Sequence, residues 1–157
     1  TSTVGRDNLA YNDMISMAGG INLASDIAGD WITVDTEWIL KQNPSIIMAF
    51  GSHAGQAVGG YDFDNSSMAA ALREGILSST GFNRTDAGKN GKIYIHQSLI
   101  ERGCDAIAVA YMAKLFYPDK FKDLDPKAIQ QEYLTKFQHI DYNVSQHGVF
   151  LYPMSDK

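Results

Sequence analysis

The sequence is poor in cysteine, poor in proline and short of positive charge. Cys104 is its only thiol, so neither an intrachain disulfide nor a cysteine metal cage can form. No run approaches the roughly 20 apolar residues that cross a bilayer, and no charged and then apolar leader opens the chain. Lys and Arg number 13 against 18 Asp and Glu, which gives a net charge of −5. That balance disfavours a nucleic-acid partner, whose phosphates attract basic surfaces.

What remains is the composition of an ordinary soluble domain. Hydrophobic residues make up 45% of the 157 positions and charged residues 20%, values typical of globular proteins. The length suits one domain, and such a chain buries roughly 70% of its unfolded surface. We therefore expect one domain with a core of its own.

Hydrophobic spacing predicts five helices and three strands. Apolar residues three or four positions apart indicate helices, and short apolar runs bounded by glycine or proline are typical of strands covered on both faces. The expected helices cover 7–18, 35–42, 66–78, 105–117 and a segment that starts at 125–126, and the expected strands cover 31–34, 45–50 and 91–96. Asp35 and Asp125 are the expected caps of their helices. The tail 141–157 is expected to be extended and docked on the body.

The alternation of helix and strand predicts an α/β fold, a three-layer Rossmann-like lobe with a mainly parallel sheet flanked by helices. Three strands, one of them short, make a thin sheet for five helices. We therefore expect a further strand, before Thr1, to complete the layer.

Several segments carry a resemblance to a known family. They are Gly-Gly-Ile-Asn at 19–22, the run 34–48 with its Asn-Pro-Ser-Ile-Ile, Gly-Lys-Ile-Tyr-Ile at 91–95, the helix end 111–118 and the run 132–137. In this order they resemble the C-terminal lobe of periplasmic (class III) substrate-binding proteins, which serve ABC importers of iron complexes, siderophores, haem, cobalamin or oxyanions.

The resemblance implies a function without catalysis. Residues 1–157 would be the C-terminal lobe of a two-lobed binding protein whose N-terminal lobe is absent from this chain. The whole receptor would capture a small molecule, a ferric chelate above all, outside the cytoplasm and deliver it to permease subunits. A lipid anchor could lie in the missing N-terminal part, and no cofactor is implied.

Glu37 is the residue that the resemblance assigns to permease docking. In the family each lobe shows a glutamate in the first turn of a short helix, where it meets arginines of the permease. A carboxylate offers guanidinium a bidentate target. The alternative is that Glu37 only stabilises its helix dipole, an effect of about 0.3–1 kcal/mol.

The glycine-rich loop 51–61 follows the carboxyl end of a predicted strand, where α/β proteins bind ligands. Ser52, His53 and Tyr61 are its candidate ligand contacts, although such loops often only make a wide turn. An α/β enzyme with its active site in Gly51–Tyr61 is the alternative function. The chain contains no Gly-x-Ser-x-Gly nucleophile elbow to support it.

Three further residues are assigned to the cleft by the resemblance. His96 ends a strand, Arg102 follows in the next loop, and Trp31 precedes Glu37 by six residues. Arginine could neutralise an anionic ligand, and tryptophan supplies a large rigid contact. The alternatives are that His96 is a hydrogen-bonded histidine at a strand end, that Arg102 is a surface charge, and that the Trp31 ring belongs to the core. The remaining histidines lack the spacing of helical metal ligands, so no metal site is predicted.

Overall fold

The structure, a computed structural model, describes residues 1–97 and 104–154, apart from the side chain of His53. The elements follow in the order β1 (Ser2–Val4), α1 (Leu9–Met17), β2 (Trp31–Thr33), α2 (Thr36–Gln42), β3 (Ile47–Phe50), β4 (Ser52–His53), β5 (Gln56–Ala57), α3 (Ser67–Ser78), α4 (Asp86–Lys89), β6 (Ile93–His96), α6 (Asp105–Phe116), α7 (Pro126–Glu132) and β7 (Leu151–Tyr152). A 3-10 turn spans Phe82–Arg84, and a π turn, Tyr133–Phe137, continues α7.

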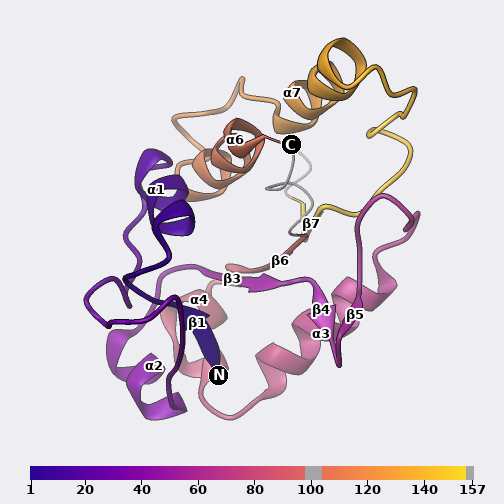
Figure 1. Cartoon of the computed structure of the whole chain (residues 1–157). Coiled ribbons are helices and arrows are strands. Elements are labelled where there is room, and N and C mark those ends of the chain that lie inside the picture. The colour runs from indigo at the N-terminus through magenta and orange to yellow at the C-terminus, as the bar shows by residue number, and fades with distance from the viewer. Residues whose placement is uncertain (98–103, 155–157) are drawn as a thin grey trace.

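The central sheet has three strands in the order β3–β6–β7 (Figure 1). β3 and β6 are parallel, with Ile47 opposite Ile93 and Phe50 opposite His96. β7 runs antiparallel to β6, so the sheet is mixed and contains the predicted parallel strands as a pair on one side of it. Two antiparallel pairs, β1 with β2 and β4 with β5, stand beside it.

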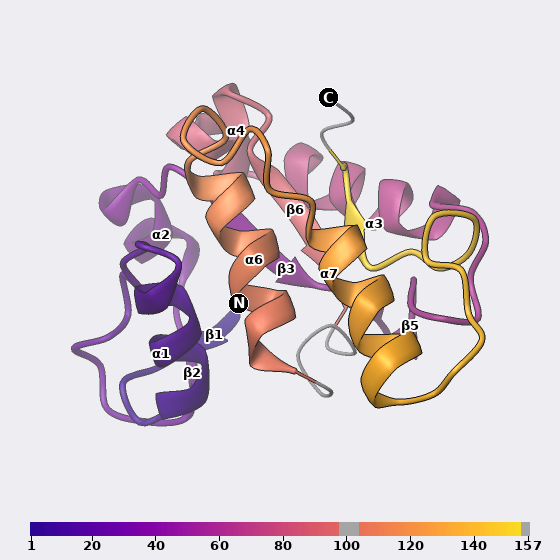
Figure 2. The same cartoon turned by 90° about the horizontal axis from the view of Figure 1, so that it is seen from above.

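Helices cover both faces of the sheet, as the α/β prediction requires. Figure 2 shows α6 and α7 on one side of β3 and β6, and α3 on the other. Met48 and Tyr94 pack into the cluster that α6 forms with its neighbours, whereas Ala49 and Ile95 pack against α3. This alternation is the period of two expected of strands with two buried faces.

Local capping fixes the starts of the helices. An Asp35 carboxylate oxygen accepts from Trp38 N–H at 2.7 Å and thereby caps α2. Asp125 accepts from Ala128 N–H at 3.1 Å, and Pro126 follows it in the first turn of α7. Both predicted caps are confirmed. α1 begins later than expected, because Asn8 is its cap.

The Gly-Gly-Ile-Asn motif closes α1 and turns the chain back. Gly19 has φ +80°, and its N–H donates to Ser16 C=O at 2.9 Å. Gly20 lies so close to α6 that a Cβ there would stand 2.5 Å from the Phe116 ring. The absence of side chains at this pair lets α1 pack beside α6.

The tail docks as expected. Beyond residue 141, Val144 and Phe150 are almost fully buried, Gly60 forms a bridge with Val149, and β7 adds an edge to the sheet. The tail thus ties the glycine-rich loop to the body.

Candidate functional site

The carboxyl ends of β3 and β6 lie side by side. Phe50 is opposite His96, and Gly51 N–H donates to His96 C=O at 2.7 Å. The chain therefore leaves both strands at the same end of the sheet, which is where α/β proteins place their ligands.

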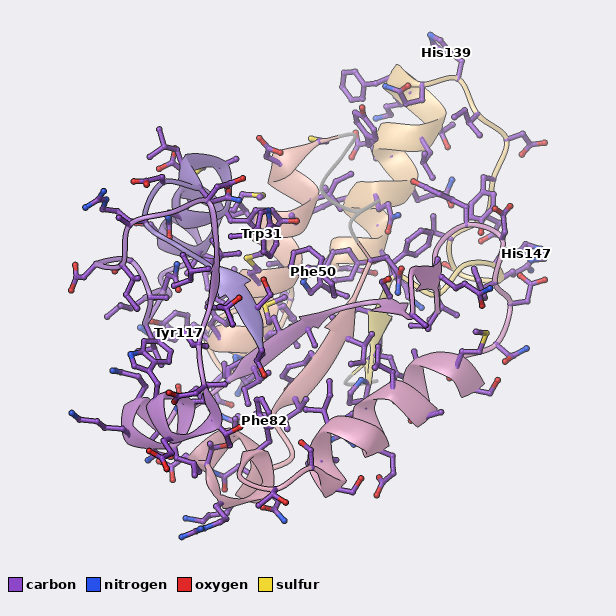
Figure 3. The ribbon with its side chains drawn as sticks, turned by 60° about the horizontal axis from the view of Figure 1, so that its bottom comes forward. Trp31, Phe50, Phe82, Tyr117, His139 and His147 are labelled. Carbon is purple, nitrogen blue, oxygen red and sulfur yellow. The ribbon has the colours of Figure 1, made fainter. Side chains whose placement is uncertain are left out.

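An aromatic cluster of Tyr11, Trp31 and Phe50 occupies this edge. The Trp31 and Phe50 ring centroids are 5.0 Å apart, and Tyr11 lies 5.8 Å from Trp31 and 5.5 Å from Phe50, all edge to face. His96, only 4% exposed, lies behind Phe50, with the ring centroids 4.6 Å apart and the ring planes tilted by 52°. Trp31 remains 46% exposed. Figure 3 shows Trp31 and Phe50 next to each other. The edge thus presents an indole whose position is set by neighbouring rings.

The loop before Trp31 is held in place by the chain after β1. Gly5 N–H donates to Asp30 C=O at 2.9 Å, and Asp7 N–H to Gly29 C=O at 3.0 Å. The Asp7 carboxylate accepts from Arg6 at 2.9 Å and from Gly29 N–H at 2.7 Å. The hydrogen bond from Arg6, and then that from Gly29, hold the Asp7 pKa below its ordinary value. Trp31 therefore emerges from a well-anchored turn.

The glycine-rich loop forms a hairpin. Ser52 pairs with Ala57, and β4 turns into β5 through Gly55 at φ +80°. Ser52 is exposed, close after Phe50 in the chain. The Tyr61 ring instead packs into the core, with its centroid 5.1 Å from Tyr142 and 4.7 Å from Phe150.

Two glycines of this loop make room for one buried amide. Gln97 is 5% exposed, and its N–H donates to Phe150 C=O at 2.9 Å. A Cβ at Gly51 would stand 1.5 Å from the Gln97 amide nitrogen, and one at Gly59 2.8 Å from it. These two glycines therefore have a packing reason that requires no ligand.

Glu37 lies in the first turn of α2 with an exposed side chain. The helix is fastened by the Asp35 cap, by the buried Ile39 and by the half-buried Trp38. The carboxylate is thus presented to solvent on a fixed support.

The structure brings Trp31 and His96 together through Phe50 and sets Ser52 nearby in the chain. It places Tyr61 in the core and Glu37 on α2, and Arg102 lies outside the described residues. Sequence analysis did not identify Tyr11 and Phe50 as residues of the site. Phe50 ends an apolar strand and Tyr11 lies on the apolar face of α1, so both read as core.

Within residues 1–97 and 104–154, no three His, Cys, Asp or Glu residues are grouped to hold a metal ion. No helix in those ranges is both long and apolar enough to cross a membrane.

The model of the periplasmic binding protein family matches residues 2–98. The chain belongs to this family. The resemblance read from the sequence is thereby confirmed. A search of curated proteins finds no match.

Solved structures agree on the fold. The TroA-like periplasmic binding protein FepB of Veillonella parvula superimposes with a TM-score of 0.79 and 26% identity, over 96% of this chain and 43% of that chain. Molybdate-bound MolA of Haemophilus influenzae superimposes with a TM-score of 0.66 and 21% identity, over 90% of this chain and 40% of that chain. CeuE of Helicobacter pylori with Ni(II) bound superimposes with a TM-score of 0.68 and 20% identity, over 89% of this chain and 42% of that chain. The chain thus spans about two fifths of these binding proteins.

Proposed function

We propose that this chain is the C-terminal lobe of a two-lobed, extracytoplasmic receptor that captures an iron chelate and delivers it to an ABC permease. The observation that carries the proposal is the aromatic cluster at the carboxyl edge of β3 and β6. Membership of the periplasmic binding protein family supports the receptor role, and the share of FepB that the chain covers supports a single lobe.

The cluster favours an organic ligand over a bare ion. Ligand sites are mostly apolar surfaces with a few polar groups. Trp31 offers such a surface, and the exposed Ser52 follows Phe50 by two residues in the chain. A flat or aromatic chelator gains about 0.5–1.5 kcal/mol per ring pair beyond burial. An oxyanion gains nothing comparable from the electron-rich face of an indole. Ferric chelates with aromatic arms are therefore the preferred ligand class.

Delivery requires no covalent step. The ligand bridges this edge and the other lobe, so it binds the closed form more tightly and shifts the population towards it. Glu37 then offers the permease a carboxylate on a rigid helix. Charge pairs of this kind set orientation and the rate of encounter.

Calorimetric titration of the two-lobed receptor tests ligand capture. Ferric catecholate and hydroxamate chelates, haem, cobalamin and molybdate serve as probes. We expect a ferric chelate to bind, and Trp31→Ala to weaken it at least fivefold, which corresponds to about 1 kcal/mol. Trp38→Phe, a change at the only other tryptophan, should leave the affinity unchanged. Absence of binding to every probe, or turnover of one of them, would refute the receptor role.

Permease docking is measured separately, as ligand uptake into cells that carry the importer. Glu37→Gln should reduce uptake at least fivefold and leave ligand affinity intact. Glu74→Gln, which removes another exposed acid on α3, is the matched control. Equal uptake by the two variants would remove Glu37 from the docking surface.

A further inference from the structure

The glycine-rich loop has a buried base and an exposed tip. The described side chains of residues 52–57 are exposed, whereas Gly51 and residues 58–60 are buried. Val58 N–H donates to Gly51 C=O at 3.0 Å and closes the base. The tip therefore begins directly at the carboxyl end of β3, and its position depends on how firmly the base is held.

The tail holds this base through backbone hydrogen bonds. Gly60 N–H donates to Val149 C=O at 2.7 Å, and Val149 N–H donates to Gly60 C=O at 3.0 Å. The next residue of the tail, Phe150, accepts from Gln97 N–H at the end of β6 at 2.9 Å. A Cβ at Gly59 would stand 2.5 Å from the Val149 carbonyl oxygen, so the two segments are in close contact. The tail thus joins the base of the loop to the central sheet.

Tyr142 adds a side-chain hydrogen bond from the tail to the loop. Its hydroxyl donates to Tyr61 C=O at 2.7 Å, directly after Gly60 in the chain. The Tyr142 ring also lies edge to face against the Tyr61 ring, with the centroids 5.1 Å apart, and both residues are half-buried. Tyr142 is itself fixed, because its C=O accepts from the Gln131 side chain of α7 at 2.8 Å. A well-supported phenol therefore holds the last residue of the loop.

A second side-chain contact of the tail, between His147 and Asp64, is weaker. His147 Nδ1 lies 2.9 Å from an Asp64 carboxylate oxygen, but the two side chains are 51% and 69% exposed. Exposed pairs of this kind contribute little, because water screens the charges and two side chains must be ordered. Asp64 also lies beyond the loop in the chain. The hydroxyl of Tyr142 is therefore the more effective of the two contacts.

We propose that Tyr142 is a positioning residue for ligand capture, which fixes the base of the glycine-rich loop and thereby sets the place of its exposed tip at the carboxyl end of β3. The proposal rests on the receptor function proposed above. A loop that is ordered before the ligand arrives loses less affinity to ordering on binding. Without the hydroxyl, the Tyr61 carbonyl is released, and the ligand has to order the loop as it binds.

Tyr142→Phe removes the hydroxyl and keeps the ring. In calorimetric titration of the two-lobed receptor with ferric catecholate and hydroxamate chelates, we expect this variant to bind about threefold more weakly or worse. Tyr117→Phe is the matched control, because the Tyr117 hydroxyl also donates to a backbone carbonyl at 2.7 Å, that of Gly19. Figure 3 shows Tyr117 and His147 on opposite sides of the molecule, and the His147 ring lies 6.1 Å from the Tyr142 ring. The control should lower the urea midpoint by a similar amount and leave the affinity unchanged.

Amide hydrogen exchange in the same receptor reports the order of the loop without a ligand. The amides of Val58 and Gly60 should exchange about threefold faster or more in Tyr142→Phe than in the parent, because their hydrogen bonds to Gly51 and Val149 open more often. Tyr117→Phe should leave both exchange rates unchanged. This comparison separates a local loss of loop order from a general loss of stability.

The outcomes distinguish the positioning role from the receptor role. If Tyr142→Phe binds the chelate as tightly as the parent, or if both tyrosine variants weaken binding equally, the positioning role is wrong and the receptor role stands. Unchanged exchange at Val58 and Gly60 in Tyr142→Phe would likewise overturn it. A parent receptor that binds no chelate would refute the receptor role, and the positioning role with it.

Discussion

Asn22 connects the end of α1 to β1, and its replacement tests whether the Gly-Gly-Ile-Asn motif is a structural element. Its side-chain amide donates to Val4 C=O at 3.0 Å and to the Asn12 side-chain oxygen at 2.8 Å. Its own oxygen accepts from Ala24 N–H at 3.1 Å. Asn12 in turn donates to Gly5 C=O at 3.0 Å. Through these hydrogen bonds the Asn22 side chain joins β1, α1 and the turn at Ala24.

The expected cost follows from these contacts. Each hydrogen bond contributes about 0.5–1.5 kcal/mol net, and more when its loss leaves a buried partner unsatisfied. Asn22 is half-buried, so we expect Asn22→Ala to lower the free energy of unfolding by about 2–3 kcal/mol. Asn22→Asp keeps the acceptor and loses both donors, and it sets a carboxylate against the Val4 carbonyl. At neutral pH its cost should be at least as large.

Urea unfolding, followed by circular dichroism, measures this loss. For a domain of this size each kcal/mol lowers Tm by about 2–4 °C, so the alanine variant should melt about 4–12 °C below the parent. Asn83→Ala is the control, since Asn83 is exposed and such changes stay within about 0.5 kcal/mol. If Asn22→Ala falls within that range as well, the hydrogen bonds around Asn22 contribute nothing and the reasoning is wrong.

Tyr111→Phe should cost about 1–3 kcal/mol in urea unfolding, because the buried hydroxyl donates to the buried Gln130 at 3.0 Å and its loss leaves that amide unpaired. The exposed Tyr117, whose hydroxyl also donates to a carbonyl at 2.7 Å, is the matched control and should lose under about 1 kcal/mol on the same change. Burial raises the pKa of Tyr111, so the folded chain keeps a proton that the unfolded chain loses near pH 10. The free energy of unfolding should therefore fall as the pH rises above about 10, and it should fall less steeply in Tyr111→Phe. An identical decrease with pH in the parent and in the variant would contradict this. Gly20→Ala places a methyl 2.5 Å from Phe116 and should destabilise by about 1–3 kcal/mol through overpacking, which an unchanged urea midpoint would disprove.

Features that depend on interactions between residues close in the sequence could be predicted. Asp35 and Asp125 cap their helices because a side-chain oxygen reaches an N–H three residues ahead, whatever the rest of the fold does. The parallel pairing of β3 with β6 was also predictable, since continuous apolar runs are typical of strands covered on both faces.

Several features that depend on contacts between distant segments could not be predicted from the sequence. β1 reads Ser-Thr-Val and shows no apolar run, yet it pairs with β2 across nearly thirty residues. The tail was expected to dock, but nothing in β7, only two residues long, specifies an antiparallel position beside β6. The partners of Trp31 were hidden for the same reason. Tyr11 and Phe50 become its neighbours only when α1, β2 and β3 converge.

Phe50 connects the central sheet to the aromatic cluster. Its backbone lies opposite His96 in the sheet, and its ring lies 5.0 Å from the Trp31 ring and 4.6 Å from the His96 ring, centroid to centroid. Because the sheet fixes the Phe50 ring beside Trp31, the ligand would meet a preorganised surface, and less affinity would be lost to ordering. Residues 1–157 alone offer a ligand only one wall of the proposed cleft, so only the two-lobed receptor measures what the cluster contributes.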